Sequence, residues 1–235
     1  LNLEAIATAI FSNSPFDQGL VSQYKSLRSH FWHHTDKNRT GLLPFVFDEN
    51  FNFEKYVEYA LDVPMYFIIR DQKYINMTNY TFRNFLENKL IDNKFIEPTI
   101  DDWINHLSTL FPQVRLKQFL EIRSMDACSW DLICSQPAFW IGLIYDENSF
   151  NKAQEVTESW TQDDRNYINE IVPKEGLHAK FKDGSILDIA QKLFEISKKG
   201  LDSRNILSRN KKYNETFYLK DLESNLTLGQ SPADI

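Results

Sequence analysis

The segment from Val114 to Arg123 carries most of its charged side chains at alternate positions. Successive side chains of an extended strand point to opposite faces, so this spacing predicts a single strand with one apolar face and one charged face. The charged face would hold Arg115, Lys117, Phe119, Glu121 and Arg123. A carboxylate two residues from an arginine could hold a metal ion and an anion side by side. The alternative is a half-buried strand whose charged face meets only water.

Arg28 and Arg39 are further candidates, because both lie in turn-rich, aromatic-rich sequence. Guanidinium groups bind carboxylates and phosphates through paired hydrogen bonds, which makes arginine a frequent ligand of anionic substrates. The alternative for each is an ordinary surface ion pair, which contributes under about 1 kcal/mol to stability.

Other familiar sites are poorly supported. The seven glycines are not clustered, which excludes a P-loop and a dinucleotide-binding fingerprint. Residues 36–47 open like a calcium loop but end in Phe47, where such a loop needs a glutamate. His30, His33 and His34 would share a helical face and could suit zinc, although a solvated loop is favoured because no carboxylate or cysteine lies at ligand spacing.

The elements that would position these residues follow from the hydrophobic spacing and from capping residues, namely a cap at Asn52 and a capping box of Thr99 and Asp102. An apolar segment covers residues 3–11, a strand-like run begins at Leu42, and residues 63–77 favour a hairpin. Helices are expected over 53–61, 81–90, 100–111, 138–146, 149–159, 161–172, 185–199 and 217–226. The chain is therefore expected to be one α+β unit over residues 1–235, with strands mainly in 1–126 and a helical layer in 127–235.

Composition narrows the classes of partner. The chain has 235 residues, 42% of them hydrophobic, and a net charge of −7, which argues against nucleic acid or an anionic membrane as a main partner. The longest apolar run, Ala138–Tyr145, is far shorter than the roughly 20 residues that span a bilayer. Two cysteines are too few for a disulfide scaffold, so we expect a soluble protein of a reducing compartment. Leu1 in place of an initiator methionine indicates missing upstream sequence.

Several motifs together resemble glutamate–cysteine ligases of the proteobacterial and plant type. They occur in the family's order over nearly the whole chain: NSPF (13–16), YKSLRSHFW (24–32), TDKNRTGLLPFVF (35–47), YALDVPMYF (59–67), TFRNFL (81–86), HLSTLFPQVRLKQFLEIRSMD (106–126) and PAFWIGLIYD (137–146). What the resemblance covers is roughly the C-terminal half of such an enzyme.

The resemblance implies a glutamine synthetase-like fold, in which a curved antiparallel sheet cups the substrates and helices pack behind it. It also implies the first step of glutathione biosynthesis: ATP phosphorylates the γ-carboxylate of glutamate, and the amine of cysteine then displaces phosphate. Mg²⁺ and arginines would neutralise the charge that moves in this reaction.

Residue roles follow from the same resemblance. Glu121 would be a metal ligand and Arg123 a phosphate contact, while Arg28 would contact phosphate or glutamate. Arg39 would hold a substrate carboxylate. The remaining candidates, expected to line the substrate site, are Asn13, Ser14, Tyr66 and Tyr74. Relatives carry a glycine and a small residue where this chain has Ser124 and Met125, so the resemblance does not predict the conformation of the loop that follows.

Alternatives stay open at this stage. One is a sister carboxylate–amine ligase with a different amine substrate; another is a catalytically incomplete fragment or interaction module. We expect the isolated fragment to be inactive and to expose an unpaired strand edge unless it forms a homodimer. A cytoplasmic location is expected, or a plastid one if the source is a plant.

Overall fold

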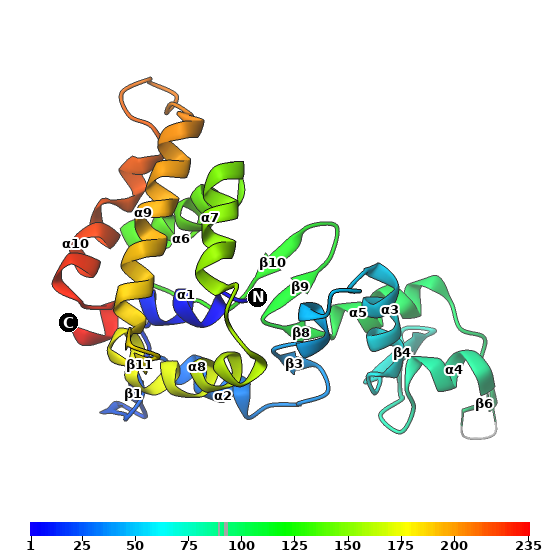
Figure 1. Cartoon of the computed structure of the whole chain (residues 1–235). Coiled ribbons are helices and arrows are strands. Elements are labelled where there is room, and N and C mark those ends of the chain that lie inside the picture. Colours follow the sequence, from blue (N-terminus) through cyan, green and yellow to red (C-terminus); the bar gives the residue numbers. More distant parts are fainter. Residues whose placement is uncertain (89, 92–93) are drawn as a thin grey trace. The chain divides into compact units, whose positions relative to one another are not determined.

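The computed structural model describes residues 1–88, 90–91 and 94–235, and these form two compact units. Unit 1 comprises residues 1–32 and 124–235, and unit 2 comprises residues 33–123. Helices and short strands occur in both (Figure 1), which confirms the expected α+β class.

Unit 1 is mainly helical. Its longest helix, α9 (Ile186–Arg204), packs against α6 (Trp130–Ile144) and α7 (Glu147–Thr157) (Figure 1). The short helix α1 (Glu4–Ile10) packs on α8 and α9, and all of its side chains are buried, as the apolar segment 3–11 predicts. The other elements are β1 (Phe16–Asp17), β2 (Leu20–Val21), α2 (Leu27–His33, ending in unit 2), α8 (Gln162–Glu175), η2 (Gly176–His178), β11 (Lys180–Phe181), β12 (Gly184–Ser185), η3 (Glu215–Leu219), α10 (Lys220–Leu228) and η4 (Pro232–Asp234).

Two helix boundaries near prolines in unit 1 differ from the sequence expectation. Pro137 lies inside α6 instead of starting it, and Pro173 lies inside α8 instead of following it. A proline removes one helical hydrogen bond, and packing of the helix can offset that loss. A short antiparallel hairpin of β11 and β12 precedes α9, and the sequence analysis did not predict it.

Helix α9 continues past Gly200, where the sequence pattern predicted its end. Gly200 is in contact with α6: a Cβ atom there would collide with the carbonyl oxygen of Gly142, and one at Gly142 would collide with that of Ser197. The two glycines therefore let the helix backbones approach closely. The helix ends instead at Asn205, which adopts the left-handed conformation common at helix ends.

Unit 2 is built from short helices and hairpins around a small core. The buried cluster at its centre consists of Met65, Ile68, Met77, Phe82, Phe85 and Ile91. Its elements are β3 (Thr40–Gly41), η1 (Pro44–Phe47), α3 (Phe53–Asp62), β4 (Phe67–Arg70), β5 (Lys73–Asn76), α4 (Phe82–Asn88), β6 (Leu90–Ile91), β7 (Lys94–Phe95), α5 (Ile100–Ser108), β8 (Phe111–Pro112), β9 (Val114–Leu116) and β10 (Leu120–Ile122). Residue 89, in the helix expected over 81–90, lies outside the described residues.

Local sequence signals set several elements of unit 2. Asn52 accepts a hydrogen bond from the backbone N–H of Lys55 and caps α3. Thr99 and Asp102 form both halves of the predicted capping box at α5. The strand-like run from Leu42 is instead a 3₁₀ helix, because Pro44 lacks a donor for a strand and its fixed φ suits the first helical position.

Residues 114–123 form a hairpin and not the single strand that the sequence pattern predicted. The chain reverses between Leu116 and Leu120, which are direct cross-strand partners, so Arg115 pairs with Glu121. Residues 117–119 connect the two strands, and with a connection of this length alternate residues still share one face of the hairpin. A hairpin and a single strand therefore give the same sequence pattern here. Just before this hairpin in the sequence, Phe111 of β8 pairs in parallel with Thr40 of β3.

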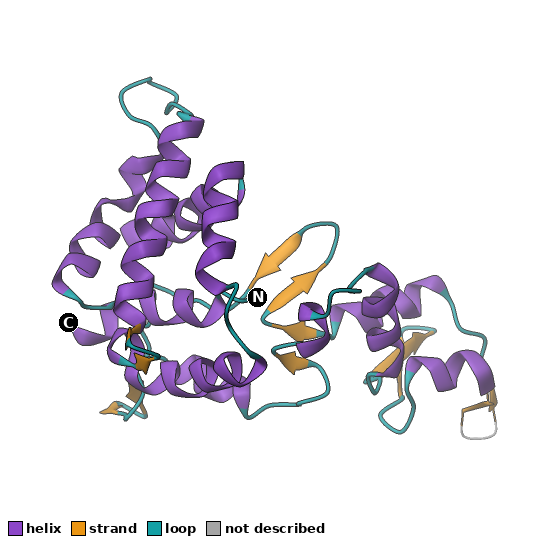
Figure 2. Ribbon diagram, in the orientation of Figure 1, coloured by secondary structure: helices purple, strands orange, loops and turns teal. Residues whose placement is uncertain are grey.

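No large curved sheet is present in the described part of the chain. Every sheet there has two strands (Figure 2). The glutamine synthetase-like sheet expected from the resemblance is therefore not confirmed.

We predict that Gly200→Ala destabilises the protein by about 1–3 kcal/mol, because the added methyl group would force α6 and α9 apart. In an exposed helix the same change would stabilise by up to about 1 kcal/mol, so the sign of the effect tests the contact. Urea unfolding measures it, with the exposed neighbour Lys199→Ala as the matched control. A Gly200→Ala protein as stable as the wild type would contradict the close approach.

Candidate functional site

The predicted site residues lie in both units. Unit 1 holds Asn13, Ser14 and Arg28, whereas unit 2 holds Arg39, Tyr66, Tyr74, Glu121 and Arg123.

Glu121 is surrounded by cationic side chains. Its Oε2 accepts hydrogen bonds from Nε and Nη2 of Arg115 at 3.0 and 2.6 Å, and lies 3.1 Å from Nζ of Lys117. Its Oε1 accepts a 2.6 Å hydrogen bond from Nη1 of Arg123. One negative and three positive charges thus share the hairpin, and the cluster as a whole carries an excess of positive charge.

Arg115 anchors this cluster to unit 2. Its side chain is buried, and its Nη1 donates to the carbonyl oxygens of Ser108 and Leu110 at 3.1 and 3.3 Å. The guanidinium groups of Arg115 and Arg123 lie 5.5 and 5.3 Å from the centre of the Phe111 ring. These contacts hold Glu121 between two arginines that pack on one aromatic ring.

The surrounding cations keep Glu121 ionised. Hydrogen bonds from Arg115, with weaker help from Lys117 and Arg123, lower the pKa of Glu121 to about 2. An ionised carboxylate is the form that binds a metal ion or orients arginines. In the described residues, however, no group of three or more His, Cys, Asp or Glu side chains could hold a metal ion. Glu121 among three cations is therefore a poor magnesium site by itself.

Arg39 is buried in unit 2 with 1% of its surface exposed. Its Nε donates to Asp36 at 2.6 Å, its Nη1 to the hydroxyl of Thr109 at 3.1 Å, and its Nη2 to the carbonyl oxygen of Pro64. The guanidinium also lies 3.7 Å from the ring centre of Tyr66. Arg39 thus joins three segments of unit 2 and contacts Tyr66, another predicted site residue.

Tyr74 lies on β5 and is 71% exposed. Its ring meets that of Phe67 edge to face, with 4.8 Å between the ring centres. This contact belongs to the β4–β5 hairpin.

The three predicted residues of unit 1 do come together. The Oγ of Ser14 accepts a 3.1 Å hydrogen bond from the backbone N–H of Arg28, and the Nη1 of Arg28 donates to the carbonyl oxygen of Ser124 at 3.1 Å. Asn13 precedes Ser14 and donates its side-chain amide to the carbonyl oxygen of Ala127 at 2.8 Å. Residues 13–14, α2 and the segment 124–127 therefore form one hydrogen-bonded group.

Buried Glu4 lies close to this group. Burial raises the pKa of its carboxyl to about 7, and the charge of the Leu1 amine, the groups of Ser124 and the charge of Arg28 act in the opposite direction. Arg28 is therefore near a carboxyl that changes its charge close to neutral pH.

Asp126 is a central residue that the sequence analysis did not single out. Its carboxylate is 3% exposed and accepts hydrogen bonds from the backbone of Asn13 and the hydroxyls of Ser14 and Ser26, at 2.7 to 2.9 Å. Its partners are 100 to 113 residues away in sequence, so no local spacing could have revealed them.

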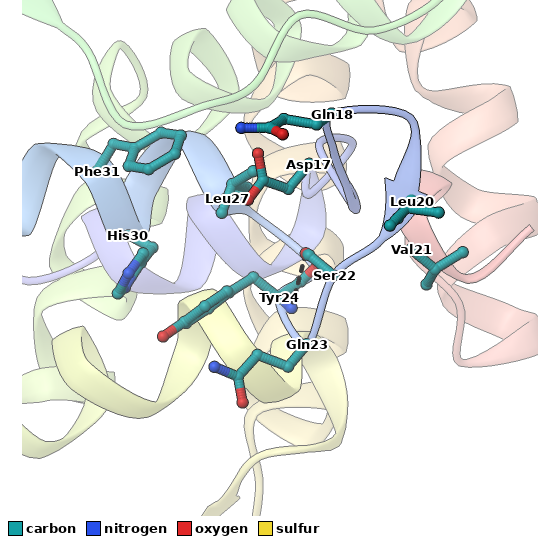
Figure 3. Close-up of a pocket in the computed structure, with 10 residues that line it drawn as sticks. All are labelled: Asp17, Gln18, Leu20, Val21, Ser22, Gln23, Tyr24, Leu27, His30 and Phe31. Atoms are coloured by element: carbon teal, nitrogen blue, oxygen red, sulfur yellow. Dashed lines mark hydrogen bonds between the residues drawn. The ribbon is translucent and has the colours of Figure 1, made fainter.

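A pocket of about 440 Å³ lies beside α2 in unit 1 (Figure 3). The hairpin β1–β2 and α2 form its walls, and the stacked rings of Tyr24 and His30 lie 3.9 Å apart at its edge. Its lining side chains are Asp17, Gln18, Leu20, Val21, Ser22, Gln23, Tyr24, Leu27, His30 and Phe31. None of these is lysine or arginine, and Asp17 contributes a negative charge.

We predict that Arg115→Ala raises the pKa of Glu121 from about 2 towards the ordinary value of 4.5, and that Lys117→Ala, the matched control, raises it less. Because the pKa is depressed in the folded state, the stabilisation from this cluster is present above pH 4.5 and is lost as pH falls towards 2. Carbon-13 NMR titration of the Glu121 carboxyl measures both shifts. An unchanged midpoint in Arg115→Ala would contradict the arrangement.

Comparison with known proteins identifies relatives over the whole chain. The sequence pattern of the glutamate-cysteine ligase family 2 (GCS2) matches residues 1–235. The chloroplastic glutamate–cysteine ligase A of Oryza sativa subsp. indica is 47% identical over 234 residues, which cover 100% of this chain and 46% of the relative. The chloroplastic enzymes of Solanum lycopersicum and Arabidopsis thaliana are each 45% identical, with 43% and 44% of their lengths covered.

Two points follow from these relatives. The chain spans less than half the length of the curated proteins it matches. The expected cytoplasmic location is contradicted, because these relatives are named chloroplastic. No helix in the described part of the chain is long and apolar enough to cross a membrane.

The match over the full length of the chain also explains why NSPF, the segment 24–47 and the segment 106–126 occur in one sequence. The chain belongs to the glutamate–cysteine ligase family 2.

Proposed function

We propose that the protein containing this chain ligates the γ-carboxylate of L-glutamate to the amine of L-cysteine with ATP as co-substrate. This is the first step of glutathione biosynthesis. The observation that carries the proposal is the family match over residues 1–235, together with relatives at 45–47% identity that are named glutamate–cysteine ligases.

The reaction has two steps. An oxygen of the γ-carboxylate attacks the γ-phosphorus of ATP, and ADP leaves with the electron pair of the broken P–O bond. The amine nitrogen then attacks the carbon of the acyl phosphate, loses a proton, and inorganic phosphate leaves. Each step brings anionic groups together, so positive side chains must stabilise the charge that develops.

Residues of both units are suited to this task. Arg123 is fixed by Glu121 and packs near Phe111, so its charge is held in place before an anion binds. Arg28 is held through its backbone and its guanidinium. We propose that Arg123 and Arg28 stabilise the phosphoryl group or glutamate, and that Asn13, Ser14, Arg39, Tyr66 and Tyr74 contribute to substrate binding.

Mg²⁺ stays a prediction from the resemblance. Glu121 is its one predicted ligand in this chain, and the three cations around that carboxylate oppose metal binding. A magnesium site would need further carboxylates, for which residues outside this chain are the natural source because the relatives are more than twice as long. We likewise propose that the longer protein completes a glutamine synthetase-like sheet; a homodimer is a prediction for its assembly.

The test is ATP-dependent dipeptide formation by the full-length gene product, with glutamate and either cysteine or other amines. We expect γ-glutamylcysteine with cysteine, identified by mass. Glu121→Gln should lower turnover at least about tenfold, because the neutral amide would no longer hold Arg115 and Arg123 by charge-assisted hydrogen bonds. The control is Lys198→Ala, which removes the ion pair between Lys198 in α9 and Glu223 in α10. This variant should keep wild-type turnover.

Turnover with another amine in place of cysteine would identify a sister carboxylate–amine ligase. A lack of turnover with every amine, in a protein that remains folded, would contradict the proposed function.

A further inference from the structure

The carboxylate of Asp126 joins three segments of unit 1. Its Oδ2 accepts hydrogen bonds from the backbone N–H of Asn13 at 2.8 Å and from the hydroxyl of Ser14 at 2.7 Å. Its Oδ1 accepts a 2.9 Å hydrogen bond from the hydroxyl of Ser26. A carboxylate that is 3% exposed and accepts several hydrogen bonds is held firmly, and removing it would leave the fully buried hydroxyl of Ser26 without this partner.

Both serines also hydrogen-bond to the first turn of α2. Ser14 Oγ accepts from the backbone N–H of Arg28 at 3.1 Å, and Ser26 Oγ accepts from that of Ser29 at 3.2 Å. Each hydroxyl thus donates to Asp126 and accepts from a backbone N–H of α2. The start of the helix that carries Arg28 is therefore tied to one carboxylate.

The side chain of Arg28 is tied to the same segment. Its Nη1 donates to the carbonyl oxygen of Ser124, two residues before Asp126. The side-chain amide of Gln136 in α6 donates to the carbonyl oxygen of Asp126 at 2.7 Å and connects the segment to the helical layer. The backbone and the guanidinium of Arg28 are thus both oriented by residues 124–126.

We propose that Asp126 is a positioning residue of the ligase: through Ser14, Ser26 and the adjoining Ser124 carbonyl, it fixes the backbone and guanidinium of Arg28 for contact with an anionic substrate. This inference rests on the proposed function and assigns a role to a residue that does not itself touch substrate. Small displacements of a catalytic group are costly, which is why a residue one step removed can control turnover.

The test is a double-mutant cycle between Asp126→Ala and Arg28→Lys in the full-length gene product. Asp126→Ala should lower kcat roughly 10- to 100-fold in the wild-type background. In the Arg28→Lys background the same change should cost under about threefold, because the geometry it protects is already lost. Equal fold-losses in the two backgrounds would show that Asp126 does not act through Arg28 and would overturn the proposal.

Asp234→Ala is the matched control. Asp234 forms a 2.6 Å ion pair with Lys25, the residue before Ser26, and its side chain is 9% exposed. Its carboxylate binds Lys25 and Ser231 instead of Ser14 and the Arg28 backbone, so any loss it causes should be the same in both Arg28 backgrounds. If Asp126→Ala does not fold, Asp126→Asn replaces it. The amide keeps one acceptor oxygen, and a smaller loss with the same dependence on Arg28 is expected.

Amide hydrogen exchange supplies a measurement that does not depend on activity. Asp126→Ala or Asp126→Asn should speed exchange at residues 13–14 and 26–29 and leave α7 and α9 unchanged. Uniform acceleration, or none at residues 26–29, would overturn the positioning role. If the wild-type protein formed no dipeptide, the proposed function would fail, and exchange at these residues would still decide whether Asp126 holds the Arg28 segment.

Discussion

Burying a charged group is costly unless its hydrogen bonds are made, and this constraint organises both units. In unit 1 the carboxylate of Asp126 accepts hydrogen bonds from Asn13, Ser14 and Ser26. These bonds join segments that are distant in sequence. In unit 2 the guanidinium of Arg115 is satisfied by Glu121 and two carbonyl oxygens. Five of the predicted site residues belong to these two hydrogen-bonded groups, namely Asn13, Ser14, Arg28, Glu121 and Arg123, so the fold fixes their geometry.

This arrangement suits a reaction between anions. Arginines that are already oriented by neighbouring groups need little reorganisation when a carboxylate or phosphate binds, which is how fixed charges stabilise a transition state. Glu121 contributes by holding Arg115 and Arg123, whatever it does for a metal ion. Arg39 differs from these arginines, because its buried guanidinium already donates hydrogen bonds to Asp36, Thr109 and Pro64. A substrate carboxylate would have to compete with these partners.

The sequence predicted local features well because their causes are local. The cap at Asn52, the capping box of Thr99 and Asp102, and the hairpin around residues 71–72 each depend on neighbouring residues. It failed where packing or pairing between distant segments decides: the helix α9 continues through Gly200 because α6 lies against it, and the 114–123 run folds back on itself. The links from Asp126 to residues 13–26 depend on the whole fold of unit 1, so alternation and motif spacing contained no sign of them.

The central claim is that the protein joins glutamate to an amine through an acyl phosphate. Glutamate labelled with oxygen-18 in its γ-carboxylate tests this most directly, in a reaction of the full-length gene product with ATP and cysteine. The account predicts that one labelled oxygen per turnover appears in the inorganic phosphate, because the phosphate leaves with a carboxylate oxygen. Unlabelled phosphate released alongside dipeptide would contradict phosphorylation of the γ-carboxylate.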